Sequence, residues 1–169
     1  MRILFTSLLC ICFFTQTPAS VPPEQPFTIA ISAEAPAEQT GPDSFTVQSA
    51  PDLFVKVKLT NTSTHNISIG DDSDSRTGVD FFNFYDIRDS NGNPAPKRKI
   101  NHPEIGSTGH GWPARILKPG ASMDVASDRI TGMYDLAPGE YSIQVSRALH
   151  ADTKDGVVKS NTIKVKVAK

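Results

Sequence analysis

The stretch DLFVKVKLT, residues 52–60, decides the fold. Its apolar side chains Leu53, Val55, Val57 and Leu59 recur at every second position, and both lysines fall between them. Because successive side chains of a β-strand point to opposite faces, this pattern predicts a strand with one buried and one exposed face. The segment 61–63, Asn-Thr-Ser, ends the strand, because such side chains hydrogen-bond to local backbone.

The same alternation recurs on both sides of this strand, and Gly- and Pro-rich turns separate the segments that carry it. The further predicted strands are 27–32, 45–47, 67–69, 79–88, 123–125, 141–145 and 157–167. No segment shows the 3.6-residue period of an amphipathic helix. Several short alternating strands with such turns predict an all-β antiparallel β-sandwich of about seven to nine strands.

The apolar faces of the strands also predict the core. The residues expected to be buried include Leu53, Val55, Val57, Tyr141, Ile143, Val145, Ile163 and Val165. Two stretches, 34–43 and 94–113, lack any periodicity, and we expect loops there. A loop as long as 94–113 is uncommon in a compact domain and is often functional.

The N-terminus has the order of a secretory signal. A single Arg2 precedes an apolar run, and small residues close the segment at Thr17 and Ala19. This pattern predicts a signal peptide over 1–19, cleaved after Ala19 or Ser20. A proline-rich tether over 20–26 and one sandwich domain over 27–169 follow. We therefore expect a secreted or periplasmic protein with no membrane span after cleavage, since the apolar run is shorter than a bilayer requires.

Cysteine and charge content narrow the class further. Both cysteines lie in the predicted leader, so the mature chain would be disulfide-free and would rely on burial for its stability. Arg2 is the one charged residue of the leader, which leaves 16 basic against 18 acidic side chains and a net charge of −2. This balance gives no basic excess for binding nucleic acid.

Four motifs carry a resemblance to a known family. The motif Leu136-x-Pro138-Gly139-x-Tyr141 is similar to the corner that opens the penultimate strand of fibronectin type III and immunoglobulin-like domains. The other motifs are VKLTNTS (57–63), IRDSNGNP (87–94) and LKPG (117–120). Over roughly residues 50–167 the chain resembles bacterial secreted immunoglobulin-like (fibronectin type III-like) β-sandwich domains. It is similar to intracellular proteinase-inhibitor-like domains and to the N-terminal sandwich of some secreted metallopeptidases. The resemblance implies a scaffold whose corner is pinned by the Tyr141 hydroxyl.

The 94–113 loop and the strand before it hold the predicted binding residues. The loop carries three consecutive cations and the single tryptophan, and its neighbouring strand turns two phenylalanines away from the core. These residues are Lys97, Arg98, Lys99, Trp112, Phe82 and Phe84. Trp and Arg are favoured at interface hot spots, and adjacent exposed aromatic rings are typical of contact patches.

The sequence also contains candidate residues for a metal site and for N-glycosylation. The acidic cluster Asp71, Asp72 and Asp74 lacks the spacing of an EF-hand, which leaves a looser calcium site at the sandwich edge open. Asn61 and Asn66 begin acceptor sequons for N-glycosylation, although Asn61 also suits a turn. The spacing of the histidines matches no zinc motif, so we predict no metal or cofactor.

No catalytic motif such as GxSxG or SxxK occurs, so we do not expect an enzyme. The sequence favours an exported, non-catalytic interaction module that presents loops on a rigid β-sandwich to a protein or glycan partner. A proteinase inhibitor and a calcium-stabilised structural domain are the alternatives. The oligomeric state is left open.

Overall fold

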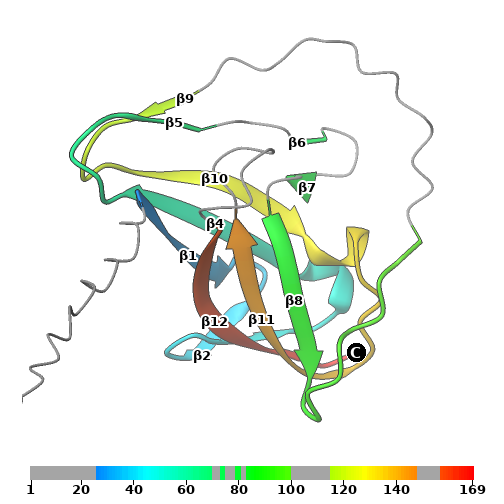
Figure 1. Cartoon of the computed structure of the whole chain (residues 1–169). Coiled ribbons are helices and arrows are strands. Elements are labelled where there is room, and N and C mark those ends of the chain that lie inside the picture. The colour runs from blue at the N-terminus through cyan, green and yellow to red at the C-terminus, as the bar shows by residue number, and fades with distance from the viewer. Residues whose placement is uncertain (1–25, 70–72, 75–78, 81–82, 100–114, 148–156) are drawn as a thin grey trace, which may run out of the picture.

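The computed structural model of the chain describes residues 26–69, 73–74, 79–80, 83–99, 115–147 and 157–169. Within these ranges the chain is an all-β sandwich, as the alternating pattern predicts (Figure 1). The predicted signal peptide, 1–19, and all of the predicted tether except Pro26 lie outside the described residues. No helix in the described part of the chain is long and apolar enough to cross a membrane.

Twelve strands and two short 3-10 turns follow one another along the described residues. They are β1 (Phe27–Ala33), β2 (Glu38–Gly41), β3 (Ser44–Val47), η1 (Ala50–Asp52), β4 (Phe54–Asn61), β5 (Ile67–Ile69), β6 (Ser73–Asp74), β7 (Val79–Asp80), β8 (Asn83–Asp89), β9 (Arg115–Leu117), β10 (Ser122–Arg129), η2 (Ile130–Gly132), β11 (Gly139–Arg147) and β12 (Val158–Val167).

Two main sheets form the sandwich. One has the strand order β1-β4-β10, and the other has the order β2-β3-β12-β11-β8. Two-stranded ribbons, β5-β9 and β6-β7, complete the topology. Strand pairs are antiparallel except β3 with β12, which is parallel and departs from the purely antiparallel arrangement that we expected. Figure 1 shows β8, β11 and β12 in front of β1, β4 and β10, so the chain crosses repeatedly between the layers.

The core lies between these layers, and it confirms the period-2 register. Leu53, Val55 and Val57 from one sheet and Ile143 and Val145 from the other are fully buried. Ile163 and Val165 are buried as well. Tyr141 departs from the prediction: it is only partly buried, because β11 reaches the rim of the sandwich at this residue.

The predicted loop over 34–43 contains a strand. β2 pairs with β3 in an antiparallel hairpin although every β2 residue except Gly41 is exposed, so no hydrophobic alternation marks it. The hairpin forms because β3 lies beside β12, which offers β2 a place at the sheet edge.

The start of the predicted 94–113 loop is tied to the fold. Pro94 bridges Arg88, and Lys97 bridges Tyr134. The Ala95 backbone N–H donates to the Ile87 carbonyl at 2.8 Å, and Ala95 is buried. Residues 94–99 are therefore an irregular connection without a strand, as expected, and two isolated bridges and the buried Ala95 attach it to the fold; 100–113 lie outside the described residues.

Candidate functional site

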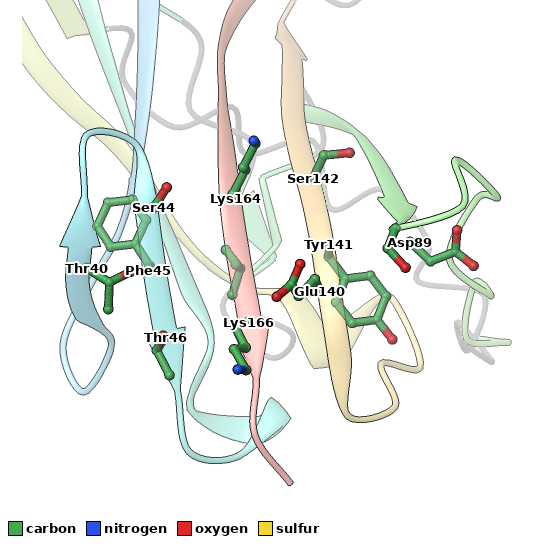
Figure 2. Close-up of a pocket in the computed structure, with 12 residues that line it drawn as sticks. Thr40, Ser44, Phe45, Thr46, Asp89, Glu140, Tyr141, Ser142, Lys164 and Lys166 are labelled. Carbon is green, nitrogen blue, oxygen red and sulfur yellow. The ribbon is translucent and has the colours of Figure 1, made fainter.

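A groove lies on the outer face of the five-stranded sheet. It has a volume of about 470 Å³ and extends over β3, β12 and β11 towards the turn that follows β8. Its polar lining comes from three strands: Ser44, Thr46, Glu140, Ser142, Lys164 and Lys166 (Figure 2). The serine and threonine side chains are short and the lysine side chains are long. The space above the short side chains is therefore unfilled, and this space is the groove.

The alternation of β12 turns Lys164 and Lys166 to this outer face, and the register shift opposite Gln144 and Ser146 brings Lys159 to it as well. Lys159, Lys164 and Lys166 are exposed, whereas Ile163 and Val165 between them are buried. We refer to the outer face that these three lysines and their cross-strand neighbours form as the lysine face. β12 lies between β3 and β11, so the lysines stand in the middle of the sheet.

Strand register places neutral polar residues beside Lys159 and Lys164, and the Glu140 carboxylate beside Lys166. Lys164 pairs with Ser142 on β11 and with Ser44 on β3. Lys159 pairs with Ser146. Directly paired residues of an antiparallel sheet have Cβ atoms only about 4.5–5.5 Å apart, so each lysine stands within reach of a hydroxyl group.

Ion pairing distinguishes the two outer faces of the sandwich. On the three-stranded sheet, the Lys56 Nζ lies 2.8 Å from the Glu34 carboxylate and 3.5 Å from that of Asp124. On the lysine face, by contrast, no ion pair joins Lys159, Lys164 or Lys166 to any carboxylate of the described residues. In the described strands, Glu140 is the one carboxylate paired in register with these three lysines, so the row keeps an excess of positive charge, which attracts anionic ligands.

The turn after β8 closes one end of the groove. The Asp89 carboxylate accepts hydrogen bonds from the Asn91 and Asn93 backbone N–H groups at 2.9 and 2.8 Å. The Asn93 backbone bond is the main reason that the pKa of the Asp89 carboxyl lies below its usual value. Gly92 has a φ of 82°, the positive value that an Asn-Gly turn accommodates. Asp89 therefore shapes this end of the groove, and its oxygens are engaged by the turn.

Tyr141 lines the groove next to this turn, and it makes the bond that the corner motif implies. Its hydroxyl donates to the Ala137 carbonyl at 2.9 Å, four residues upstream. The bond holds the entry to β11 in place, and with it Glu140 and Ser142.

The predicted loop residues that the structure describes lie at the surface. Lys97, Arg98 and Lys99 are all exposed. The Arg98 guanidinium is held by Asp135, at 2.7 Å between Nη2 and Oδ1, so this cation is already compensated. Trp112 lies outside the described residues.

Phe84 is the exposed aromatic residue that the strand pattern predicts. Its side chain is 60% exposed and pairs with Ser146, which in turn pairs with Lys159. Phe84 thus stands in a row of the lysine face and not on the 94–99 connection. Phe82 lies outside the described residues. Sequence reasoning identified the ring but could not assign it to this row, since the row is set by strand register.

The residues of the predicted glycosylation and calcium sites are described only in part. Asn61 is fully buried; its Nδ2 donates to the carbonyls of His65 and Leu117, so it serves the turn. Asn66 is exposed. Asp71 and Asp72 lie outside the described residues, and Asp74 is described only as part of β6. The described residues contain no group of three or more His, Cys, Asp or Glu that could hold a metal ion.

A buried polar cluster joins the two sheets at the opposite end of β11 from Tyr141. The Tyr85 hydroxyl donates to Asp128 Oδ2 at 2.6 Å, and Asn83 Nδ2 donates to the same oxygen at 2.9 Å. Arg147 Nη1 donates to Asn83 Oδ1 at 2.7 Å. All four residues are at least 92% buried, so the cluster acts inside the sandwich.

No family model matches this chain, and no curated protein matches it.

Proposed function

We propose that this chain is an exported, non-catalytic interaction module of the immunoglobulin-like type that binds its partner on the lysine face. The observation that carries the proposal is the groove of about 470 Å³ lined by Lys164 and Lys166, neither of which has an ion-pair partner among the described residues. A rigid sheet positions both ammonium groups before any ligand arrives, which lowers the entropy lost on binding.

The side chains of the groove favour binding over catalysis. A nucleophilic mechanism needs a hydroxyl hydrogen-bonded to a base. In the described part of the groove, the Ser44 hydroxyl donates to the Pro42 carbonyl and the Tyr141 hydroxyl to the Ala137 carbonyl. Both hydroxyls bond to backbone carbonyls, which are not bases, so these bonds serve structure.

Export is supported by the order of charged, apolar and small residues over 1–19. We expect the exported product to begin at Ser20 or Val21, corresponding to cleavage after Ala19 or Ser20. N-terminal sequencing of the protein recovered from outside the cytoplasm measures this directly. An exported product that still carries Met1 would remove the export part of the proposal.

The binding site is tested by cosedimentation of the mature protein with washed envelope particles of its source cells. We expect the wild type to sediment with the particles and Lys164→Gln/Lys166→Gln to lose at least four fifths of this bound fraction. Lys97→Gln/Lys99→Gln is the matched control, because it removes the same charge from the 94–99 connection. The proposal is wrong if the wild type stays in the supernatant, or if only the control variant loses binding.

A further inference from the structure

The lysine face has the charge pattern of a site for an extended polyanion. Lys164 and Lys166 are two residues apart on one strand, which places their Cα atoms about 7 Å apart. Lys159 continues the same strand beyond a bulge between Gln144 and Ser146 of the partner strand. The positive charges therefore follow a line along β12, whereas a compact anion such as free phosphate would need cations that converge on one point.

The neighbours of this line are hydrogen-bonding groups that suit sugar hydroxyls. Ser142 and Ser146 flank it on β11, and Ser44 and Thr46 flank it on β3. A serine or threonine hydroxyl both donates and accepts hydrogen bonds, as a sugar hydroxyl does. Glu140, which pairs with Lys166, adds an acceptor for a sugar hydroxyl.

An exposed aromatic ring, that of Phe84, lies at the Lys159 end of the same face. Phe84 pairs with Ser146, and Ser146 pairs with Lys159, so the ring lies two strand spacings, or about 10 Å, from the Lys159 backbone. The faces of a pyranose ring carry C–H groups that pack flat on an aromatic side chain. Because Phe84 is 60% exposed, it offers such a surface without any rearrangement of the core.

From this combination we infer that the ligand of the lysine face is an anionic polysaccharide, lying extended along β12 with its acidic groups on Lys159, Lys164 and Lys166 and a sugar ring on Phe84. This inference rests on the proposed function, since it names the ligand class of the same face. The acidic group is a carboxylate or a sulfate, because lysine binds either as a point charge.

Other polyanions fit the face less well. Single-stranded nucleic acid binds on successive aromatic platforms, whereas the two aromatic rings that the described residues of this face present, Phe84 and the partly buried Tyr141, pair with Ser146 and Asp89 at separate positions along β11. An acidic peptide needs apolar anchors or a free strand edge for affinity. Lys164 and Lys166 stand on a stretch of β12 whose two edges are paired with β3 and β11.

The test measures binding of the full mature protein to four immobilised polymers at low salt. The polymers are polygalacturonate, its fully methyl-esterified form, dextran sulfate and poly-L-glutamate. We expect binding to polygalacturonate or dextran sulfate at least tenfold tighter than to poly-L-glutamate or to the uncharged ester. The first two polymers distinguish a carboxylate from a sulfate ligand. Affinity should fall steeply between 50 and 300 mM NaCl, because salt screens surface charges.

Three variants assign the binding to the lysine face. Lys159→Gln/Lys164→Gln/Lys166→Gln should weaken binding at least tenfold, and Phe84→Ala at least threefold, with thermal unfolding unchanged in both. Lys58→Gln is the control, since Lys58 is an exposed lysine on the outer face of the other sheet. Tight binding that survives the triple variant would overturn the inference.

Two further results would contradict the ligand class. Equal affinity for poly-L-glutamate and for the acidic polysaccharides would reduce the site to non-specific charge. Sedimentation with envelope particles in the absence of binding to either acidic polysaccharide would overturn the polysaccharide while leaving the interaction module intact. Failure of both experiments would overturn the proposed function itself.

Discussion

Single polar side chains hydrogen-bond to backbone groups at the turns and strand ends, and so satisfy groups that strand pairing leaves without a partner. Asn61 does so from a fully buried position, where its Oδ1 accepts from the Ser63 backbone N–H at 2.9 Å and its Nδ2 donates to two carbonyls. Asp89 does so from an exposed turn. Buried polar groups need such partners, because an unmade bond costs more than a made bond contributes. These residues therefore fix the ends of strands that hydrophobic burial alone would allow to fray.

Tyr141 makes the bond of this kind that can be removed most cleanly. Tyr141→Phe keeps the ring and deletes only the hydroxyl that donates to the Ala137 carbonyl. Because Tyr141 is only partly buried and the carbonyl can be hydrated, we expect a loss near the lower end of the usual range of about 0.5–1.5 kcal/mol. Urea denaturation with an unchanged m-value measures it. Tyr141→Leu, which also removes the ring, should cost more; equal stability of the wild type and the Phe variant would show that the corner does not depend on the hydroxyl.

At the level of elements, side chains tie one sheet to the other where no strand pairing does so. Asn161 of β12 binds the edge strand β1: its Oδ1 accepts from the Ile31 N–H at 2.8 Å, and its Nδ2 donates to the Ile31 carbonyl at 3.2 Å. The amide thus replaces a missing strand neighbour. It also blocks the exposed edge at which another chain could pair.

We predict that Asn161→Ala lowers the free energy of unfolding by about 1–3 kcal/mol, because it leaves the Ile31 N–H without this acceptor in a partly buried place. Asn161→Asp should be destabilising as well, since a carboxylate cannot donate to the Ile31 carbonyl and would face the Asp43 carboxylate, which now accepts from Nδ2 at 2.9 Å. Thr162→Val, one position along and exposed, should stay within about 0.5 kcal/mol of wild type. Denaturant unfolding of the three variants decides between a structural tie and a surface contact.

Glu34 links the segment after β1 to the other strands of its sheet, and it should make stability depend on pH. Hydrogen bonds from Lys56 and from the Ser127 hydroxyl hold the pKa of its carboxyl below the ordinary value of 4.5. A depressed folded-state pKa stabilises the fold above the unfolded value, and this contribution disappears as the pH falls through the folded pKa. The window therefore opens at about pH 4.5 and extends below it.

Glu34→Gln should accordingly cost about 0.2–1 kcal/mol at pH 7, the range of an exposed ion pair. The difference from wild type should shrink as the pH is lowered from 5 to 3. Glu140→Gln is the control, because no described residue forms an ion pair with Glu140. A difference that grows on acidification would contradict the assigned sign.

The sequence predicts the individual strands better than it predicts which residues of neighbouring strands lie side by side. Successive side chains of a strand point to opposite faces, so the alternating pattern identifies the buried face of 53–59. It also predicts that Lys164 and Lys166 point outward. It does not reveal that Ser44 and Ser142 flank Lys164, since register depends on turns and bulges distant in the chain. The exposed strand β2 has no hydrophobic signal at all. The groove, which is a product of register, could not be foreseen.

At the scale of the whole molecule, the two ends of the sandwich differ in character. One end carries the groove, with Tyr141 at its rim. The other contains the buried cluster of Asn83, Tyr85, Asp128 and Arg147, which ties β8 and β11 to β10. Burying charge is costly unless geometry and hydrogen bonds compensate it, so the contribution of such a cluster to net stability is small and its contribution to the relative placement of the sheets is the larger effect. The lysine face depends on that placement, because β11 and β12 belong to the sheet that the cluster fixes.

A double-mutant cycle tests whether the cluster couples the sheets. Tyr85→Phe removes the 2.6 Å bond to Asp128, and Asp128→Ala removes the shared acceptor of Tyr85 and Asn83. Each change alone should destabilise the fold, with Asp128→Ala the larger at about 3–5 kcal/mol. The double variant should lose less than the sum of the two by about 0.5–3 kcal/mol, because both changes delete the same interaction.

Tyr85→Phe combined with Tyr141→Phe is the control pair. Tyr141 pairs with Asp89, and Tyr85 pairs with Val145, so the two tyrosines lie at separate positions along β11. The effects of these two changes should therefore add within about 0.5 kcal/mol. Additivity of the Tyr85 and Asp128 changes would show that the bond between these two side chains does not couple the sheets.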